Sequence, residues 1–325
     1  MGRLLRLIVG LTLTAIVFWL ADPIAVVRAA AAARLSWIAA AVLLVIPDRA
    51  LMAYRWLVLL QPIDPARRAP LGAVLKIFFV STFVGTFLPS VGGDAARAYG
   101  LSRHGIAAAD AAASVLMDRL MGVWSLLLIA LPGVALSEAV RRDAGVLTAV
   151  AITAAACAAA ALVLFSVQAA EVLKRALALL PGGGLRRSAE RLLDSVRRYR
   201  NHRAVLANVT IGSLAVQAIR VLQSYCIGVA LGIPTPLVVY FALIPVILLI
   251  LLIPVTINGL GTAQLAFVWL FGRVGVPGAE AFALSVLAVS LGIVGNLPGG
   301  VIFTFGGARR RDARPSSEAG TPRGL

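Results

Sequence analysis

The sequence predicts an all-α, polytopic membrane helical bundle, and three observations carry this prediction. Hydrophobic residues make up 60% of the 325 residues and charged residues only 14%, and the mean hydropathy is +0.95. These values lie far outside the range of soluble globular domains. Several apolar runs approach the roughly 20 residues that a helix needs to cross about 30 Å of hydrocarbon. The remaining polar stretches are too short for an independent catalytic domain.

Six apolar runs are long enough for full spans. In chain order they are 4–20, 36–60, 114–131, 146–166, 205–231 and 279–305. Two further apolar regions, 71–96 and 237–272, are interrupted by proline and glycine, so each is expected to form a broken hairpin. Together these elements make residues 1–306 one transmembrane domain. The tail 307–325 is rich in Arg, Pro, Ser and Gly and is expected to be disordered.

The first apolar run allows two interpretations. Arg3 and Arg6 precede it, and the segment Ala29–Ala33 offers small residues of the kind found at signal-peptide cleavage sites. The run is longer than a typical signal core, however, and the chain behind it is polytopic. We therefore expect an uncleaved first span.

Basic residues indicate the orientation of the bundle. The formal net charge is +16, and the charges lie in loops, where they suit contact with anionic lipid headgroups rather than nucleic acid. The most basic stretch, 168–203, contains nine Lys and Arg residues and three acidic ones. By the positive-inside rule this loop, the N-terminus and the tail face the cytoplasm, as in a multi-pass protein of the cell inner membrane.

This orientation constrains the two broken regions. If 71–96 crossed the membrane once, the loop 168–203 would be placed outside. If 71–96 is instead a hairpin that enters and leaves on the cytoplasmic side, the number of crossings before the loop 168–203 is even, and this loop is cytoplasmic like the N-terminus. The region 237–272 begins and ends outside, so it is a second re-entrant hairpin or a pair of short spans. Two breaks that approach the midplane from opposite faces are typical of inverted repeats in transporters.

Apolar residues in the basic loop follow helical spacing. Leu185, Leu192, Val196 and Tyr199 would share one face of a helix, with arginines around them. This amphipathic helix either lies on the inner leaflet or packs against the bundle.

The two breaks are candidate binding elements. Their proline, glycine and polar residues are Pro89, Gly92, Gly93, Pro254, Asn258, Gly259, Gly261 and Gln264. Such breaks are tolerated in a membrane only where they are buried in protein or line a wet cavity. The glycines would supply positive φ or let helices pack closely. Helix N-termini at the breaks would present free N–H groups to a phosphate.

Ionisable residues inside the membrane regions are the other candidates, because each needs a partner or water there. Those favoured for headgroup binding are Arg49, Asp94, Arg97, Asp118, Arg119 and Arg220, and further polar groups are Asp48, Arg55, Gln217 and Asn296. The arginines outnumber the acids, and a guanidinium binds phosphate through two parallel hydrogen bonds, so the set suits an anionic headgroup. The alternative is that pairs such as Asp48–Arg119 or Asp118–Arg49 only hold helices together.

The sequence offers no catalytic constellation. His104 and His202 lie in predicted loops, and Cys157 and Cys226 lie in spans without metal-ligand spacing. We therefore expect no metal, no cofactor and no enzymatic activity.

Four segments resemble motifs of one family. They are 54–60 (Tyr-Arg-Trp-x-x-Leu-Leu), 89–99 (Pro-Ser-x-Gly-Gly-Asp-x-x-Arg-x-Tyr), 115–120 (Val-Leu-Met-Asp-Arg-Leu) and 254–264 (Pro-Val-Thr-x-x-Gly-x-Gly-Thr-x-Gln). In this pattern the chain, over residues 4–306, resembles the lysylphosphatidylglycerol synthase transmembrane-region family of flippase-like membrane proteins. That family often has Glu at the positions of Asp118 and Gln264, and the second difference removes a charge.

The resemblance implies a translocator of a lipid or a lipid-linked molecule, with the anionic headgroup held in a midplane cavity. Family members fused to a cytosolic aminoacyltransferase domain make and flip lysyl-lipid. This chain ends about 20 residues after its last span, so it resembles the translocating half alone, and lipid synthesis is not expected. Two alternatives stay open: a non-transporting accessory subunit of a lipid- or glycan-synthesis enzyme, and a membrane-embedded lipid transferase.

Overall fold

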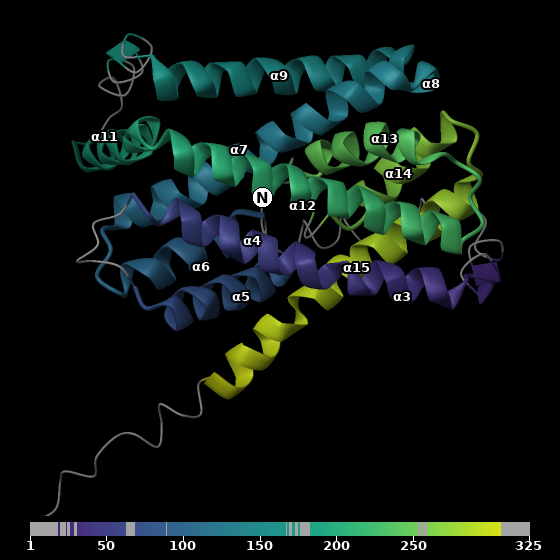
Figure 1. The fold of residues 1–325 in the computed structure, drawn as a ribbon, viewed down its shortest axis with the longest axis horizontal. Coiled ribbons are helices and arrows are strands. Elements are labelled where there is room, and N and C mark those ends of the chain that lie inside the picture. Colours follow the sequence, from purple (N-terminus) through teal and green to yellow (C-terminus); the bar gives the residue numbers. More distant parts are fainter. Residues whose placement is uncertain are drawn as a thin grey trace, which may run out of the picture.

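The molecule is a bundle of helices that run roughly along one direction (Figure 1). This computed structural model describes residues 31–62, 69–88, 90–166, 183–252, 256 and 259–306, with a few isolated residues in 19–28 and 168–175. All regular elements in these ranges are helices, as the sequence predicts. The predicted span 4–20, the tail 307–325 and the break residues Pro89, Pro254 and Asn258 lie outside the described residues.

Four continuous helical stretches are long and apolar enough to cross a membrane. They are Leu35–Leu59, Ala108–Leu136, Arg203–Ala230 and Gly278–Thr304. The first comprises α3 (Leu35–Leu43) and α4 (Val45–Leu59), and the others are α7 (Ala108–Leu136), α12 (Arg203–Ala230) and α15 (Gly278–Gly306). The predicted run 146–166 is also helical, as α9 (Ala144–Phe165), which follows the short α8 (Glu138–Arg141). Within the described residues, the predicted spans are thus confirmed as helices.

The two interrupted regions each form a pair of short helices. The first pair is α5 (Leu71–Phe87) and α6 (Ser90–Ser102), and the second is α13 (Leu237–Ile250) and α14 (Thr262–Gly272). At 1.5 Å per residue the 13 residues of α6 extend only about 20 Å, which is less than the hydrocarbon thickness. Figure 1 shows the two hairpins toward opposite ends of the bundle. The orientation of the hairpins relative to the membrane stays a prediction from the charges.

One order of helices occurs twice in the described residues: a continuous helical stretch, two shorter helices and a long helix, first in α3–α4, α5, α6 and α7 and again in α12, α13, α14 and α15. We call these two segments the halves of the chain. The last helix of each half, α7 or α15, has 29 residues. A turn precedes each of them, with Gly105 (φ 85°) before α7 and Gly275 (φ 84°) before α15. A Cβ added at Gly133 of α7 would lie 2.6 Å from the backbone of α13, and one at Gly299 of α15 would overlap the Phe79 carbonyl oxygen of α5. Each first short helix therefore packs on the last long helix of the other half.

The main apolar core lies among α7, α12, α13 and α14. Tyr240, Ile247 and Phe271 are fully buried there. The Tyr240 ring meets the rings of Tyr225 and Phe271 at centroid distances of 5.4 and 5.2 Å. The polar residues of the long helices gather outside this core, where α4, α6, α7 and α12 meet.

The basic loop folds into α11 (Gly183–Arg198), which packs against the bundle. Its apolar face, including Val196, is buried, and Ser195 Oγ donates to the Asp110 carboxylate at the start of α7 at 2.8 Å. The hydroxyl of Tyr199, just after α11, donates to the Leu59 carbonyl oxygen at 2.7 Å, and burial raises the pKa of Tyr199. Of the two expected placements, the structure shows contact with the bundle. Figure 1 places α11 at the same end as the α5–α6 hairpin.

Candidate functional site

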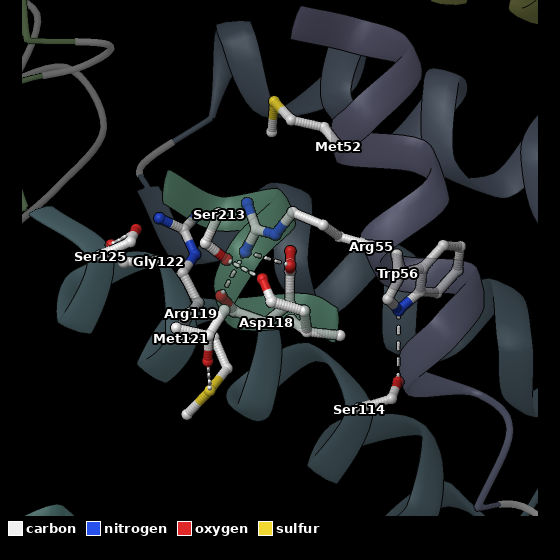
Figure 2. Close-up of polar contacts among 12 residues, drawn as sticks. Met52, Arg55, Trp56, Ser114, Asp118, Arg119, Met121, Gly122, Ser125 and Ser213 are labelled. Carbon is white, nitrogen blue, oxygen red and sulfur yellow. Dashed lines mark hydrogen bonds and ion pairs between the residues drawn. The ribbon is translucent and has the colours of Figure 1, made fainter. Parts of the chain in front are cut away.

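Asp118 on α7 is the centre of a buried ion-pair network that joins three helices. Arg55 Nη2 of α4 lies 2.8 Å from Asp118 Oδ1 and also donates to the Asp118 carbonyl oxygen at 3.2 Å. Arg97 Nη1 of α6 lies 3.2 Å from the other carboxylate oxygen. Figure 2 shows Arg55 reaching across from α4 to Asp118. Both carboxylate oxygens are therefore paired, and two guanidinium groups share one negative charge.

Arg97 is held by neighbouring side chains from three helices. Its guanidinium carbon lies 5.1 Å from the centre of the Trp56 ring and 4.8 Å from that of Phe78, and its Nε donates to Ser81 Oγ at 3.5 Å. Contact with two aromatic rings restricts the plane of the guanidinium. Arg97 is thus suited to holding Asp118 in place, and it is buried.

A second ion pair is less buried than the first. Arg119 Nε of α7 lies 2.8 Å from Asp94 Oδ2 of α6. The Arg119 side chain is 46% exposed and that of Asp94 is 21% exposed, compared with 4% for Arg55. Because a ligand can reach an exposed guanidinium without unburying it, Arg119 is the arginine of this group that is most open to an incoming anion.

A third group joins α4, α12 and α15. Asp48 Oδ1 lies 3.2 Å from Arg220 Nε of α12, and Oδ2 lies 3.6 Å from Arg49 Nη1. Arg220 Nη2 also donates to the Met52 sulfur at 3.1 Å, and Arg49 Nη2 donates to the Gly292 carbonyl oxygen of α15 at 3.1 Å. As at Asp118, two arginines share one acid.

The first of two adjacent cavities has a volume of about 390 Å³. Its charged lining residues are Arg55, Arg97, Arg119, Arg220, Asp94 and Asp118. Residues of both hairpins contribute to the wall, among them Gly93 of α6 and Gly259 just before α14. The cavity therefore lies where the two broken regions approach each other, with more arginines than acids around it.

The second cavity has a volume of about 320 Å³ and is lined mainly by apolar side chains, with Asp48 and Arg49 among the polar ones. It shares Arg220, Leu251 and Asn296 with the first cavity. A polar cavity and a largely apolar one thus meet at a common wall. Over the described ranges, no group of three or more His, Cys, Asp or Glu side chains is placed to hold a metal ion.

The structure brings most of the sequence-predicted charged residues to one place. Those on the first cavity are Asp94, Arg97, Asp118, Arg119 and Arg220, while Arg49 lies on the second. The alternative pairs Asp48–Arg119 and Asp118–Arg49 are wrong in their partners. Since α6 packs on α7 and α12 packs on α4, each aspartate meets arginines from those neighbours instead.

Arg55 is the residue that sequence reasoning placed in a span but did not choose for the site. The structure makes it the closest partner of Asp118. Its position holds a usable signal, because Asp48, Met52 and Arg55 are spaced at i, i+4 and i+7 and so share one helical face. All three contact the ion-pair groups.

The two breaks use glycine differently. Gly259 and Gly261 have φ of 74° and 82°, as predicted for backbone that other L-residues avoid. The same prediction is wrong for Gly92 and Gly93, which lie inside α6. A Cβ added at Gly93 would lie 3.0 Å from Gly85 Cα. Close packing of α5 on α6 is therefore what Gly93 provides.

Gln264 caps the helix after the second break. Its Oε1 accepts a hydrogen bond from the Gly261 N–H at 2.6 Å, and its side chain is buried. Nearby, Thr256 Oγ1 and Thr262 Oγ1 lie 3.0 Å apart. Thr256 and Gly259 line the first cavity, whereas Gln264 acts on the backbone that holds them.

These features lie in a chain that matches a known family model. The model of the lysylphosphatidylglycerol synthase TM region matches residues 7–299, nearly the whole chain. The chain belongs to this family. Searches among curated proteins and among solved structures gave no match. Together with the long apolar helices, membership identifies the chain as an integral membrane protein and confirms the resemblance indicated by the four motifs.

Within this lysylphosphatidylglycerol synthase TM region, Asp118 and Gln264, the two positions singled out by the sequence comparison of motifs, have different environments. Asp118 keeps a carboxylate and pairs with two arginines. Gln264 has no charge, and its amide oxygen serves as a helix cap. The second interrupted region, 237–272, contains no charged residue.

Proposed function

We propose that this protein translocates a lipid, or a lipid-linked molecule, whose anionic headgroup binds in the first cavity. The observation that carries the proposal is the excess of guanidinium groups, since four arginines and only two aspartates line the cavity. Charges interact more strongly where water is scarce. A phosphate or phosphodiester would supply the missing negative charge and accept two parallel hydrogen bonds from a guanidinium.

The second cavity supports an amphiphilic ligand. Its wall is mainly apolar, and it joins the arginine-lined cavity at Arg220, Leu251 and Asn296. A free anion in water needs no apolar neighbour, whereas a lipid has an apolar part beside its phosphate. The pairing of the two cavities thus favours a lipid over a small soluble anion.

The placement of the hairpins supports movement of that ligand between the two leaflets. The hairpins lie toward opposite ends of the bundle (Figure 1), and each contributes residues to the first cavity, such as Gly93 and Gly259. Small movements of one hairpin or the other would open the cavity toward one end at a time. In this proposal the protein lies in the cell inner membrane with α11 on the cytoplasmic side, uses no cofactor and catalyses no reaction.

Reconstituted vesicles test the proposal. Purified protein is inserted into vesicles with acyl-labelled fluorescent phosphatidylglycerol, and dithionite is added to bleach the outer leaflet. We expect bleaching to extend to the inner-leaflet lipid at a rate well above that of protein-free vesicles. In Arg119→Gln the rate should fall by about tenfold, which corresponds to the loss of one charge-assisted hydrogen bond.

Arg119 is chosen because its side chain is half exposed, so its substitution should leave folding intact. Arg273→Gln is the matched control, since Arg273 is 55% exposed, also pairs with an aspartate, Asp143, and lies outside both cavities. Bleaching no faster than in protein-free vesicles, across anionic and zwitterionic lipids, would overturn the proposal. Co-purification of such an inactive protein with a lipid- or glycan-synthesis enzyme would favour the accessory-subunit alternative.

A further inference from the structure

Two amide side chains of the first cavity take no part in the ion-pair groups. Gln217 of α12 and Asn296 of α15 line this cavity, and Gln217 is only 3% exposed. Gln217 Oε1 and Asn296 Oδ1 are buried and have no hydrogen-bond partner among the residues that the structure describes. A buried acceptor without a partner costs free energy. A ligand that brought a donor to it would remove that cost.

The orientation of the Gln217 amide follows from its neighbours. Its Nε2 faces the Gly122 carbonyl oxygen at 3.5 Å and Ser125 Oγ at 3.4 Å, and Ser125 already donates to the same carbonyl (Figure 2). A carbonyl only accepts, so the N–H end of the amide must face it. Both contacts are long for hydrogen bonds. The amide is therefore held weakly and can turn about its last torsion toward the cavity.

The hydroxyl groups of the cavity also present acceptors. Ser81 and Thr82 donate to the Phe78 carbonyl oxygen, and Thr86 donates to that of Thr82. Their protons are thus engaged. Ser81 Oγ already accepts a hydrogen bond from Arg97, and Thr86 Oγ1 accepts one from Asn296 Nδ2 at 2.8 Å, so what these hydroxyl groups still offer a ligand is their remaining lone pairs. The neutral groups of the cavity require a ligand that donates hydrogen bonds, while the arginines require one that accepts them.

Electrostatics decides between the two common donors of lipid headgroups. An ammonium group would lie among four guanidinium groups, and the two aspartates that line the cavity already pair with three of them. Asp118 pairs with Arg55 and Arg97, and Asp94 pairs with Arg119. A hydroxyl group is neutral and is not repelled in this way. We propose that Gln217 and Asn296 select headgroups that carry free hydroxyl groups next to the phosphate, as glycerol and sugar phosphates do. This inference rests on the proposed function and adds the chemical class of the headgroup.

Binding of two matched lipids tests the subsite. Phosphatidylglycerol and phosphatidylpropanol with the same acyl chains have the same phosphodiester charge, but only the first has free hydroxyl groups. Binding of each lipid to the purified full chain in detergent is measured by native mass spectrometry. We expect the unmodified protein to bind phosphatidylglycerol about fivefold to tenfold more tightly, the ratio that one or two net hydrogen bonds provide.

Three variants assign the preference to the amides. Gln217→Met keeps the length of the side chain and should reduce the preference to less than about twofold. Phosphatidylpropanol should still bind to this variant, which shows that the cavity is formed. Asn296→Leu should reduce the preference in part. Asn208→Leu is the control, since Asn208 is an exposed amide on α12 that donates to the Tyr54 hydroxyl at 3.0 Å, and its loss should leave the preference unchanged.

The outcomes separate the subsite from the proposed function. Equal affinity of the unmodified protein for both lipids, or a preference that is undiminished in Gln217→Met and Asn296→Leu, would overturn the subsite and leave the anion-binding cavity in place. Binding of neither lipid would overturn both. Displacement of phosphatidylglycerol by soluble glycerol phosphate, but not by propyl phosphate, would support recognition of the headgroup alone. A lipid preference without such displacement would support the subsite for the intact lipid.

Discussion

The α5–α6 and α13–α14 hairpins occupy corresponding places in the two halves, yet only the first carries charge into the site. Asp94 and Arg97 of α6 form ion pairs with residues of α7. At the start of α14, Thr262 and Gln264 make neutral hydrogen bonds to the segment before the helix. The two halves thus repeat an order of helices without repeating the charges.

This difference has a consequence for how a headgroup would be held. On the side of the first hairpin it would meet guanidinium groups, and on the side of the second it would meet hydroxyl and backbone groups such as those of Thr256 and Gly259. Removing one partner of a buried ion pair costs more free energy than removing one neutral hydrogen bond. Substitutions in the two hairpins are therefore expected to differ in size.

The largest effect is expected for Asp118→Asn. This change keeps the shape of the side chain but leaves Arg55 and Arg97 buried without a counter-charge, which should lower the free energy of unfolding by about 3–5 kcal/mol. Thermal unfolding in detergent measures the change. Glu138→Gln removes an exposed ion pair with Arg142 and should cost less than about 0.5 kcal/mol. Equal unfolding temperatures for the two variants would mean that the ion pairs of Asp118 do not stabilise the first hairpin.

A smaller decrease in the free energy of unfolding is expected for Gly93→Ala. The new methyl group would approach Gly85 Cα within 3.0 Å, so α5 and α6 would have to separate, at a cost of about 1–3 kcal/mol. Gly72→Ala in α5 is the control because its added Cβ meets no atom within 4 Å. The same unfolding measurement should find Gly72→Ala neutral or slightly stabilising. If both variants unfold alike, close packing at Gly93 is not needed.

The smallest effect is expected at the neutral break, for Gln264→Ala. The Gly261 N–H would lose the acceptor that now lies 2.6 Å away, and loss of a helix cap costs about 1 kcal/mol. Unfolding in detergent again provides the measurement. A loss as large as that of Asp118→Asn would contradict the division between a charged and a neutral hairpin.

Much of the architecture could be predicted from the sequence, because long apolar runs and the breaks in them are local features. The arginine excess was also visible in the sequence, and it led to Arg97, Arg119 and Arg220 on one cavity. The pairing of charges could not be predicted, since it depends on which helices pack side by side. The partner of Arg55 was missed for this reason: Arg55 shares a helical face with Asp48, but its pairing with Asp118 follows from the contact of α4 with α7.

The glycines show a second limit. The pair Gly92–Gly93, three residues after Pro89, is compatible with a turn of positive φ and also with a close helix crossing. The sequence alone does not distinguish these two possibilities. At Gly259 and Gly261 the backbone has positive φ, whereas at Gly93 the neighbouring Gly85 makes the position intolerant of a side chain. Only the three-dimensional distance between α5 and α6 separates these cases.

The exchange of partners between the halves bears on how the protein is made. During synthesis α5 and α7 enter the membrane well before α15 and α13, the helices on which they pack. Until then the surfaces at Phe79 and Gly133, where the two crossings are closest, face lipid or an insertion factor. The packing of the first half therefore stays incomplete until α15, the last helix, has been synthesised. Assembly of this bundle is thus a late event, and a chain truncated before α15 would lack the helix on which α5 packs while α7 could still pack on α13.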